Sequence, residues 1–346
     1  MIYWLIFLLS FLGTYYVMPH TIRKLRENNY VVNDMYKSEK TLVPTNAGTI
    51  VLFISFLSIS LFPLFVRIFN FIIAQESPIN ELNETNLAFL LVVSIYAIYG
   101  LVDDLVDIGR KLKLLFPILF AYPLIGVINP ENIWLPIYGD FNLGNEFYNK
   151  IQWNDLFKIF VIPIYVMVVS NLVNMHSGYN GLQSGLSIIL LSTLILKSFL
   201  IGKIDDIFPS IAFLGSIVAF WFFNKYPSKV FEGNIGSLLF GSVIGSVIVI
   251  QELWWFGFFI MIPHTLNFLL WVTWLILIKK DPATYLESDG KHKKFGKVSK
   301  DGYIVVPNRL TLKWIPNYYY KIDENKSVFI IQSFTLLFCL IGLILL

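Results

Sequence analysis

The stretch Gly48-Thr-Ile-Val-Leu-Phe-Ile-Ser-Phe-Leu-Ser-Ile-Ser-Leu-Phe-Pro-Leu-Phe-Val66 decides the fold class, because its 19 residues contain no charged side chain. A helix needs about 20 mostly apolar residues to cross the hydrocarbon core of a bilayer. Nine similar segments accompany it. The ten segments are residues 2–18, 48–66, 87–102, 112–128, 156–175, 186–201, 207–223, 235–250, 253–278 and 328–346. Because helices satisfy their backbone hydrogen bonds within each segment, the sequence predicts an all-α polytopic membrane protein with ten transmembrane helices.

The overall composition excludes most other classes of protein. Of the 346 residues, 56% are hydrophobic and 14% are charged, whereas a soluble domain carries about 25% charged residues. The single cysteine, Cys339, excludes a disulfide framework and a cysteine zinc cluster. A net charge of only +3 gives no general attraction for nucleic acid. We therefore interpret residues 1–346 as one integral membrane domain in the lipid bilayer.

The distribution of Lys and Arg predicts the orientation in the membrane. About 20 of these residues lie in the loops after the first, third, fifth, seventh and ninth segments, and the other four loops hold only a few. Because positively charged loops stay in the cytoplasm, both termini are predicted to be extracytoplasmic. The longest cytoplasmic loop, residues 279–327, contains a β-like patch from Gly302 to Pro307. The outer loop 129–155 is typical of a hairpin that turns at Tyr138-Gly-Asp140.

Three carboxylates stand at the predicted cytoplasmic end of the third segment, in Gly100-Leu-Val-Asp103-Asp104-Leu-Val-Asp107. Asp103 and Asp107 are four residues apart and therefore share a helix face. Carboxylates so close to the hydrocarbon core are costly, which favours a functional role. One interpretation is a Mg²⁺–diphosphate site or a catalytic base, and the other is a solvated helix end.

A second polar stretch follows the fifth segment and contains no Lys or Arg. It reads Asn171-Leu-Val-Asn174-Met-His-Ser-Gly178-Tyr-Asn180-Gly181-Leu-Gln-Ser-Gly185. Amide oxygens suit a hard cation such as Mg²⁺, and glycines let backbone N–H groups approach a phosphate. The alternative is an ordinary polar loop between two spans.

Two more polar motifs lie on the same predicted side. Phe231-Glu-Gly-Asn234-Ile-Gly-Ser237 precedes the eighth segment and, taken alone, favours a helix start with a polar cap. Lys291-His292-Lys293-Lys294-Phe-Gly-Lys297 would clamp a diphosphate, attract anionic lipid or be simply solvated. Because all four motifs face the cytoplasm, their Asp, Asn, Lys and His side chains together predict one site for Mg²⁺-assisted phosphoryl transfer.

These motifs resemble those of the polyprenyl-phosphate N-acetylhexosamine-1-phosphate transferases. That family includes the eukaryotic enzyme that starts dolichol-linked N-glycan assembly and the bacterial phospho-MurNAc-pentapeptide translocase. The acidic motif followed by Lys113-Leu-Leu-Phe-Pro117 matches well, as does N-x-x-N-x-x-x-G-x-N-G-L from Asn171 to Leu182. The Asn180-Gly181-Leu182 ending is similar to the eukaryotic and archaeal branch. Number of segments, orientation and motif order extend the resemblance over most of the chain.

The chain departs from the family pattern at three positions. Asn234 stands where the family has a metal-binding Asp, and Asp107 stands where the dolichol enzyme has Asn. The basic motif around His292 has Lys in place of Arg. A charge lost at one place and an acid gained at another suggest either a rearranged metal site or neutral variation.

The resemblance implies an enzymatic activity. The expected reaction transfers N-acetylhexosamine 1-phosphate, GlcNAc-1-phosphate first of all, from a UDP-sugar to a polyprenyl (dolichyl-type) phosphate. It releases UMP and begins lipid-linked glycan assembly. The expected cofactor is Mg²⁺, with Mn²⁺ as an alternative. The expected location is a prokaryotic cell membrane, or the endoplasmic reticulum of a eukaryote, with a cytosolic active site; a homodimer is left open.

The resemblance also assigns roles to eleven residues, which fall into four groups. The metal ligands would be Asn174 and Asn234. The groups that neutralise the diphosphate would be Lys291, His292 and Lys293. The acceptor would be met by Lys113 and oriented or deprotonated by Asp103 and Asp104. The uracil would lie between Gly178 and Phe231, with Asn180 nearby.

Two other function classes stay open at this point. Intramembrane prenyltransferases also bind isoprenyl diphosphate at D-D-x-x-D, but the only other Asp-Asp pair, Asp205-Asp206, is predicted on the opposite side. An ion-coupled transporter would carry polar groups within its spans. The acids of this chain stand at helix ends, and the one interruption, Pro263-His264 in the ninth segment, more often indicates packing.

Overall fold

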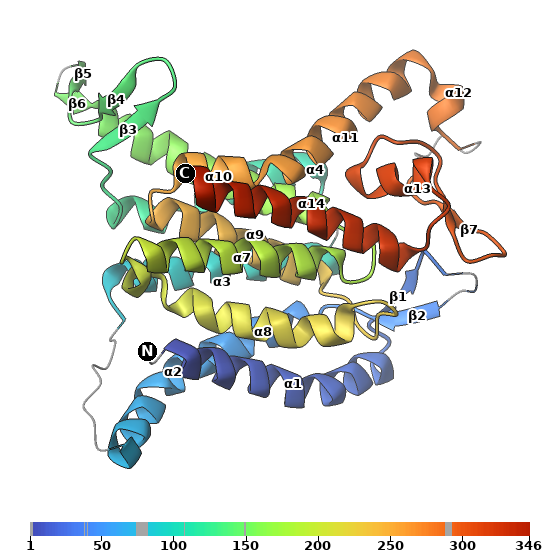
Figure 1. Cartoon of the computed structure of the whole chain (residues 1–346), viewed down its shortest axis with the longest axis horizontal. Helices are drawn as coiled ribbons and strands as arrows, with labels where there is room; N and C mark the ends of the chain where they lie inside the picture. Colours follow the sequence, from blue (N-terminus) through green and yellow to red (C-terminus); the bar gives the residue numbers. More distant parts are fainter. Residues whose placement is uncertain are drawn as a thin grey trace.

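Helices dominate the computed structural model of this chain (Figure 1), which describes residues 3–37, 39, 41–73, 82–106, 108–148, 150–287 and 293–346. The principal helices are α1 (Tyr3–Glu27), α2 (Gly48–Ile73), α3 (Glu84–Val106), α4 (Arg110–Phe120), α6 (Ile162–Met175), α7 (Leu182–Leu200), α8 (Pro209–Asn224), α9 (Gly233–Ile250), α11 (Ile262–Lys280) and α14 (Glu324–Leu345). The shorter ones are α5 (Trp153–Leu156), α10 (Trp254–Ile260), α12 (Pro282–Tyr285) and α13 (Ile315–Tyr319).

Within the described residues, 8 helices are long and apolar enough to cross a membrane. They are α1, α2, α3, the continuous stretch Trp153–Met175, α7, α9, α11 and α14. The fourth and seventh predicted segments coincide with shorter apolar helices, Leu115–Gly126 and Pro209–Asn224. The chain is therefore a helical, polytopic membrane protein, as predicted. The count of ten crossings stays a prediction, because α8 has 16 residues and rises only about 24 Å.

The ninth predicted segment differs from its expected form, because it is two helices and not one. α10 ends at Ile260, and α11 begins at Ile262. Pro263 lies in the first turn of α11, where it has no N–H to donate to the preceding turn. Figure 1 shows α11 leaving the bundle at an angle to its neighbours. His264 packs edge-on against the His176 ring, with ring centroids 4.6 Å apart.

The helix α9 is the centre of the bundle, with 89% of its residues buried. Small residues let its neighbours approach closely. A Cβ added to Gly241 would lie 2.6 Å from Cα of Ser170 on α6, and one added to Gly100 on α3 would lie 2.5 Å from the carbonyl oxygen of Asn234. The second contact brings the acidic end of α3 directly to the start of α9.

Four short antiparallel hairpins lie at the two ends of the bundle. They pair β1 (Val31–Asp34) with β2 (Thr41–Pro44), β3 (Asn132–Leu135) with β4 (Gly139–Asn142), β5 (Glu146–Tyr148) with β6 (Ile151–Gln152), and β7 (Lys297–Val298) with β8 (Ile304–Val305). The outer hairpin turns at residues 136–138, slightly before the predicted position, because Gly139 and Asp140 already belong to β4. The β1–β2 pair was not expected, whereas β8 lies within the predicted β-like patch.

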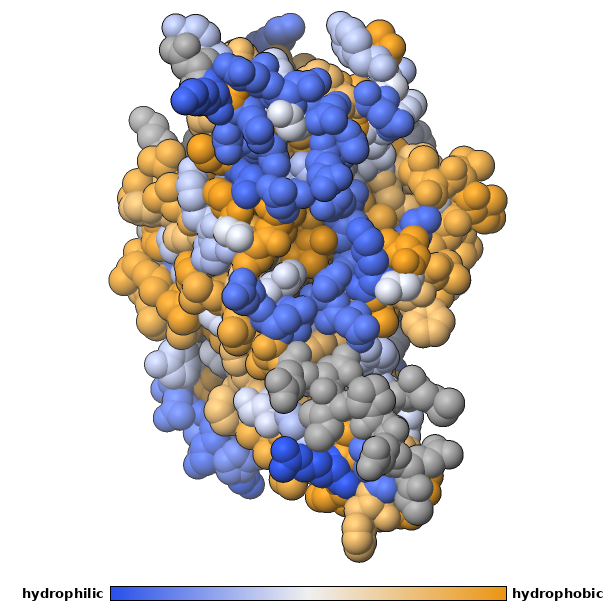
Figure 2. Space-filling view, turned by 90° about the vertical axis from the view of Figure 1, so that its left-hand side faces the viewer, coloured by the Kyte–Doolittle hydropathy of each residue, from blue (hydrophilic) through white to orange (hydrophobic). Residues whose placement is uncertain are grey.

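Both chain ends lie at the same end of the bundle as β3 to β6, and β1, β2, β7 and α13 lie at the opposite end (Figure 1). Figure 2 looks onto the end with the termini and shows hydrophilic side chains flanked on both sides by hydrophobic ones. The Tyr3 hydroxyl hydrogen-bonds to the Asp205 carboxylate. The pair Asp205-Asp206 therefore lies at this end, as predicted, and away from the other polar motifs.

Candidate active site

A cavity of about 340 Å³ lies at the end of the bundle opposite the termini. Its wall is built from β1 and the residues after it, the end of α3, the segment between α6 and α7, and the start of α9. Six of the residues with a predicted role line it. They are Asp104, Asn174, Gly178, Asn180, Phe231 and Asn234. Three motifs that are far apart in the sequence thus meet at one place.

Asp103 stands behind this cavity and links three elements. Its carboxylate is 6% exposed. It pairs with Lys113 at 2.8 Å, and it accepts hydrogen bonds from the Asn234 side chain at 2.8 Å and from the backbone of Ile108 at 2.9 Å. Lys113, which was predicted to meet the lipid phosphate, is therefore held beside the acidic pair through Asp103.

Asp104 lies in the cavity wall and caps the central helix. Its carboxylate accepts hydrogen bonds from the backbone N–H groups of Asn234 at 3.1 Å and Ile235 at 3.3 Å. Negative charge at the beginning of a helix is favoured by the helix dipole and by the free N–H groups there. The polar cap of α9 is thus supplied by α3, and Asp104 holds the backbone of Asn234 in position.

Asn180 occupies the predicted place, but its side chain is already engaged by the protein. Its Nδ2 donates to Asp34 at 3.1 Å, and its Oδ1 accepts from Lys37 at 3.1 Å. Its backbone N–H donates to Glu324 at 2.6 Å. Lys37 also pairs with Asp34 at 3.0 Å and with Glu324 at 2.8 Å. Asn180 is therefore the centre of a buried polar network that joins β1, the loop after α6, and α14.

Asp34, Lys37 and Glu324 were missed by the sequence analysis, because none stands in a motif with the others. Lys37 and Glu324 are 287 residues apart, so no local pattern could have indicated their contact. Burial alone would lower the pKa of Lys37, but the carboxylates of Glu324 and Asp34 outweigh it and raise that pKa above its usual value. The network thus retains its cation at physiological pH.

Glu232 was also missed as a site residue, although it stands inside a quoted motif. It lines the cavity beside Asn234, and its carboxylate accepts a hydrogen bond from Asn224 at 3.1 Å. Burial raises the pKa of Glu232 to about 7. This carboxyl group therefore carries a full negative charge only above neutral pH.

Lys313 is a second buried cation beside the site, and it comes from the long loop 279–327. Its Nζ donates to the carbonyl of Ser177 at 2.9 Å. Burial lowers the pKa of Lys313 to about 8, and Glu324 opposes this shift. Gly178 has φ +108°, and a Cβ added to it would lie 2.3 Å from Nζ of Lys313. The positive φ favours glycine at this position, and a larger residue would also displace the end of the Lys313 side chain.

The predicted basic motif is only partly described. Lys291 and His292, like Asp107, lie outside the described residues. Lys293 lies within them, but its Nζ donates to the Thr284 carbonyl at 2.8 Å and it does not line the cavity. Phe295, which follows this motif, does line it. None of the described lysines of this motif lines the cavity, and the motif reaches it only through Phe295.

The side chains of the cavity suit a hard cation. Asp104, Asn174, Glu232 and Asn234 line the same space, and their side chains carry the carboxylate and amide oxygens that Mg²⁺ prefers. The Asn174 amide makes no hydrogen bond to any other described residue, so its oxygen is available. No three His, Cys, Asp or Glu side chains of the described residues form a metal-binding group. The residues fit Mg²⁺ if a bound phosphate supplies part of the coordination shell.

Known proteins are similar to this chain along most of its length. The model of glycosyl transferase family 4 matches residues 86–252, which contain the acidic motif, the Asn-Gly motif and the start of α9. A protein of Methanocaldococcus jannaschii named as a glycosyltransferase is 31% identical over 82% of this chain and 78% of its own length.

Two further relatives have more specific names. A protein of Sulfolobus acidocaldarius is 29% identical over 80% of this chain and 78% of its own length, and is named as a UDP-N-acetylglucosamine–dolichyl-phosphate N-acetylglucosaminephosphotransferase. A phospho-N-acetylmuramoyl-pentapeptide-transferase of Borreliella afzelii is 27% identical over 70% of this chain and 72% of its own length.

The fold and the cavity define the class first: this is a helical integral membrane protein with a polar, oxygen-lined site at one end of its bundle. The relatives then give its family. The chain belongs to glycosyl transferase family 4, as its resemblance to the sugar-phosphate transferases implied.

Proposed function

We propose that this protein transfers N-acetylhexosamine 1-phosphate, with GlcNAc as the sugar, from a UDP-sugar to a polyprenyl phosphate of the dolichyl type. UMP leaves. The observation that carries the proposal is the convergence of Asp104, Asn174 and Asn234 on one cavity in a chain of this family. The names of the archaeal relatives support both the donor and the acceptor.

The chemistry makes positioning the main task of the protein. An oxygen of the acceptor phosphate forms a bond to the sugar-bearing phosphorus of the donor, and the bond to UMP breaks. A phosphate monoester has its second pKa near 6, so the acceptor is mostly ionised at pH 7. It therefore needs alignment and shielding from charge repulsion more than it needs a base.

Mg²⁺, or Mn²⁺ in its place, would supply the positive charge that draws the diphosphate oxygens together. Asn174 and Asn234 are the proposed protein ligands, with Asp104 and Glu232 as the carboxylates in the same wall. Asp103 is a positioning residue in this scheme, because it holds both Lys113 and the Asn234 side chain. These contacts keep a cation and a metal ligand next to each other.

The cavity wall also suits the nucleoside part of the donor. Gly178 and Phe231 both line the cavity and would enclose the flat uracil ring. Asn180 would contribute through the backbone that its network holds in place, since its amide is already bonded to Asp34 and Lys37. Lys291, His292 and Lys293 would approach the diphosphate from the loop 279–327 once donor is bound.

The site is proposed to face the cytosol because the loops at its end carry most of the Lys and Arg residues. The cell is proposed to be prokaryotic because relatives of this chain are archaeal. A direct experiment is UMP release by the purified protein from a panel of UDP-sugars with polyprenyl phosphate and Mg²⁺. We expect release with UDP-GlcNAc that depends on the acceptor. Absence of UMP with every N-acetylhexosamine donor would refute the proposal.

A further inference from the structure

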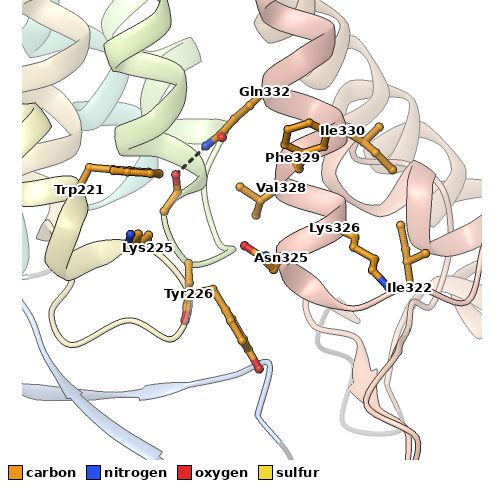
Figure 3. A pocket seen from close by; sticks show the side chains of 12 residues that line it. Trp221, Lys225, Tyr226, Ile322, Asn325, Lys326, Val328, Phe329, Ile330 and Gln332 are labelled. Atoms are coloured by element: carbon orange, nitrogen blue, oxygen red, sulfur yellow. Dashed lines mark hydrogen bonds between the residues drawn. The ribbon is translucent and has the colours of Figure 1, made fainter.

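A second cavity, of about 440 Å³, opens between the end of α8 and the first turns of α14. Figure 3 shows Trp221 and Lys225 on the α8 side, opposite Asn325 and Val328 on α14. It is larger than the candidate active site and shares only one lining residue with it, Asn180. The two cavities are therefore separate spaces that meet at Asn180.

The charges around this cavity are positive. Among the described residues that line it, two are lysines, Lys225 and Lys326, and none is acidic. Nζ of Lys225 lies 5.0 Å from the ring centroid of Trp221 and makes no ion pair with another described residue. Lys326 has only a long contact of 3.7 Å to Asp323, and both of these side chains are well exposed. An anion would therefore be attracted to the rim of the cavity.

Much of the remaining wall is apolar, beside the polar side chains of Asn180, Tyr226, Asn325 and Gln332, and it lies at the end of α8 and the start of α14. Trp221 is in the last turn of α8, and Phe329 and Ile330 are in the second turn of α14. Phe329 is 68% exposed and Ile330 is 44% exposed, so this surface faces the lipid. Trp and Lys together at a helix end are typical of the membrane–water interface, where an apolar stem or ring meets the charged headgroups.

We propose that this cavity binds the phosphate headgroup of an anionic bilayer phospholipid. The phosphate lies at Lys225 and Lys326, and the first part of an acyl chain lies along Trp221 and Phe329. Basic residues at this depth attract anionic lipid headgroups. The polyprenyl phosphate acceptor is a poorer occupant of this cavity. It must reach the proposed reaction site, and the residues of that site, Asp104 and Asn234, line the other cavity.

A lipid in this position contacts the segment that forms the active site. The Gln332 side chain lines the lipid cavity and donates a hydrogen bond of 2.9 Å to the Gly181 carbonyl (Figure 3). Gly181 follows Asn180 and is the N-cap residue of α7. Since a ligand that binds only the folded state stabilises it, occupancy stabilises the loop between α6 and α7.

The test measures lipid binding and uses no donor, so its failure would leave the proposed transferase activity untouched. The full-length protein is placed in nanodiscs that contain phosphatidylglycerol or phosphatidylcholine with brominated tails, which quench nearby tryptophans. The contribution of Trp221 is the difference between the parent and Trp221→Phe. We expect this contribution to be at least twofold larger with brominated phosphatidylglycerol.

Two charge-matched variants decide whether the cavity is responsible. The double variant K225Q/K326Q should lose the preference for phosphatidylglycerol. The control K229Q/K321Q removes two exposed lysines that are close in sequence to Lys225 and Lys326 but do not line the cavity, and it should keep the preference. Equal loss in both variants would overturn the proposal in favour of general surface charge. Displacement of brominated phosphatidylglycerol by polyprenyl phosphate would overturn it in favour of the acceptor.

Discussion

At the scale of single residues, Asn234 stands where the resemblance led us to expect a metal-binding Asp, and the structure shows what the amide does there. Its amide nitrogen donates to Asp103 at 2.8 Å, which an ionised Asp at this position would not do. The lost metal-binding charge is thus exchanged for a hydrogen bond to the buried acid. Glu232, two residues earlier in the same wall, is a carboxylate that partly restores the charge.

Substitution of Asn234 should separate its hydrogen bond to Asp103 from its proposed role as a metal ligand. Asn234→Asp places two carboxylates side by side. Without Mg²⁺ the free energy of unfolding should therefore fall by about 1–3 kcal/mol, and the unfolding temperature should fall with it. Added Mg²⁺ should recover more stability than in the parent and reach half-maximal rate at a lower concentration. Thermal unfolding and a Mg²⁺ titration of UMP release measure both. If Asn234→Ala follows the parent titration, Asn234 is not a metal ligand.

Glu232 should make stability depend on pH. Burial raises its folded pKa to about 7 from the usual 4.5 of a glutamate, so the folded protein holds a proton that the unfolded chain releases first. The stabilisation is therefore complete below about pH 4.5 and is lost as the pH rises through about 7. Glu232→Gln should flatten this part of the profile, by roughly 3 kcal/mol at most. Unfolding in detergent from pH 5 to 8 compares the two, and parallel profiles would contradict the assignment.

At the scale of elements, the site depends on how closely α3 approaches α9. Gly100→Ala would place a methyl group 2.5 Å from the backbone oxygen of Asn234, which cannot move aside as a flexible side chain could. Overpacking of this kind costs about 1–3 kcal/mol, and the shift of Asp103 and Asp104 should lower turnover at least about tenfold. Gly109→Ala is the matched control, because nothing lies within 4 Å of an added Cβ there. Equal effects would show that the contact is not important.

The helices and the site residues differ in how far the sequence could indicate them. Long apolar runs located the helices, because a segment that crosses lipid exposes apolar side chains and pairs its backbone groups within a helix. The interruption at Pro263-His264 was visible in the sequence, but the ninth segment was still predicted as a single span, whereas the structure divides it at Met261. Asp104, Asn174 and Asn234 were expected at one site and do share a cavity. Lys313 and the pair Lys37–Glu324 were not expected, because they reach the site only through tertiary contacts.

At the scale of the whole molecule, the two ends of the bundle should face opposite compartments. Glu84 and Lys229 are exposed in the structure, so each can be replaced by Cys after the buried Cys339 is changed to Ala. The basic loops predict that an impermeant thiol reagent labels position 84, but not 229, from outside intact cells. Labelling of both from outside would contradict the predicted orientation.

The central claim is that the protein transfers a sugar together with its phosphate. It is tested most directly with UDP-GlcNAc labelled with ³²P at the β position, incubated with polyprenyl phosphate and Mg²⁺. The account predicts that the label moves to the lipid fraction while unlabelled UMP is released in equal amount. Sugar in the lipid fraction with the label retained in released UDP would mean simple sugar transfer, and would contradict the account.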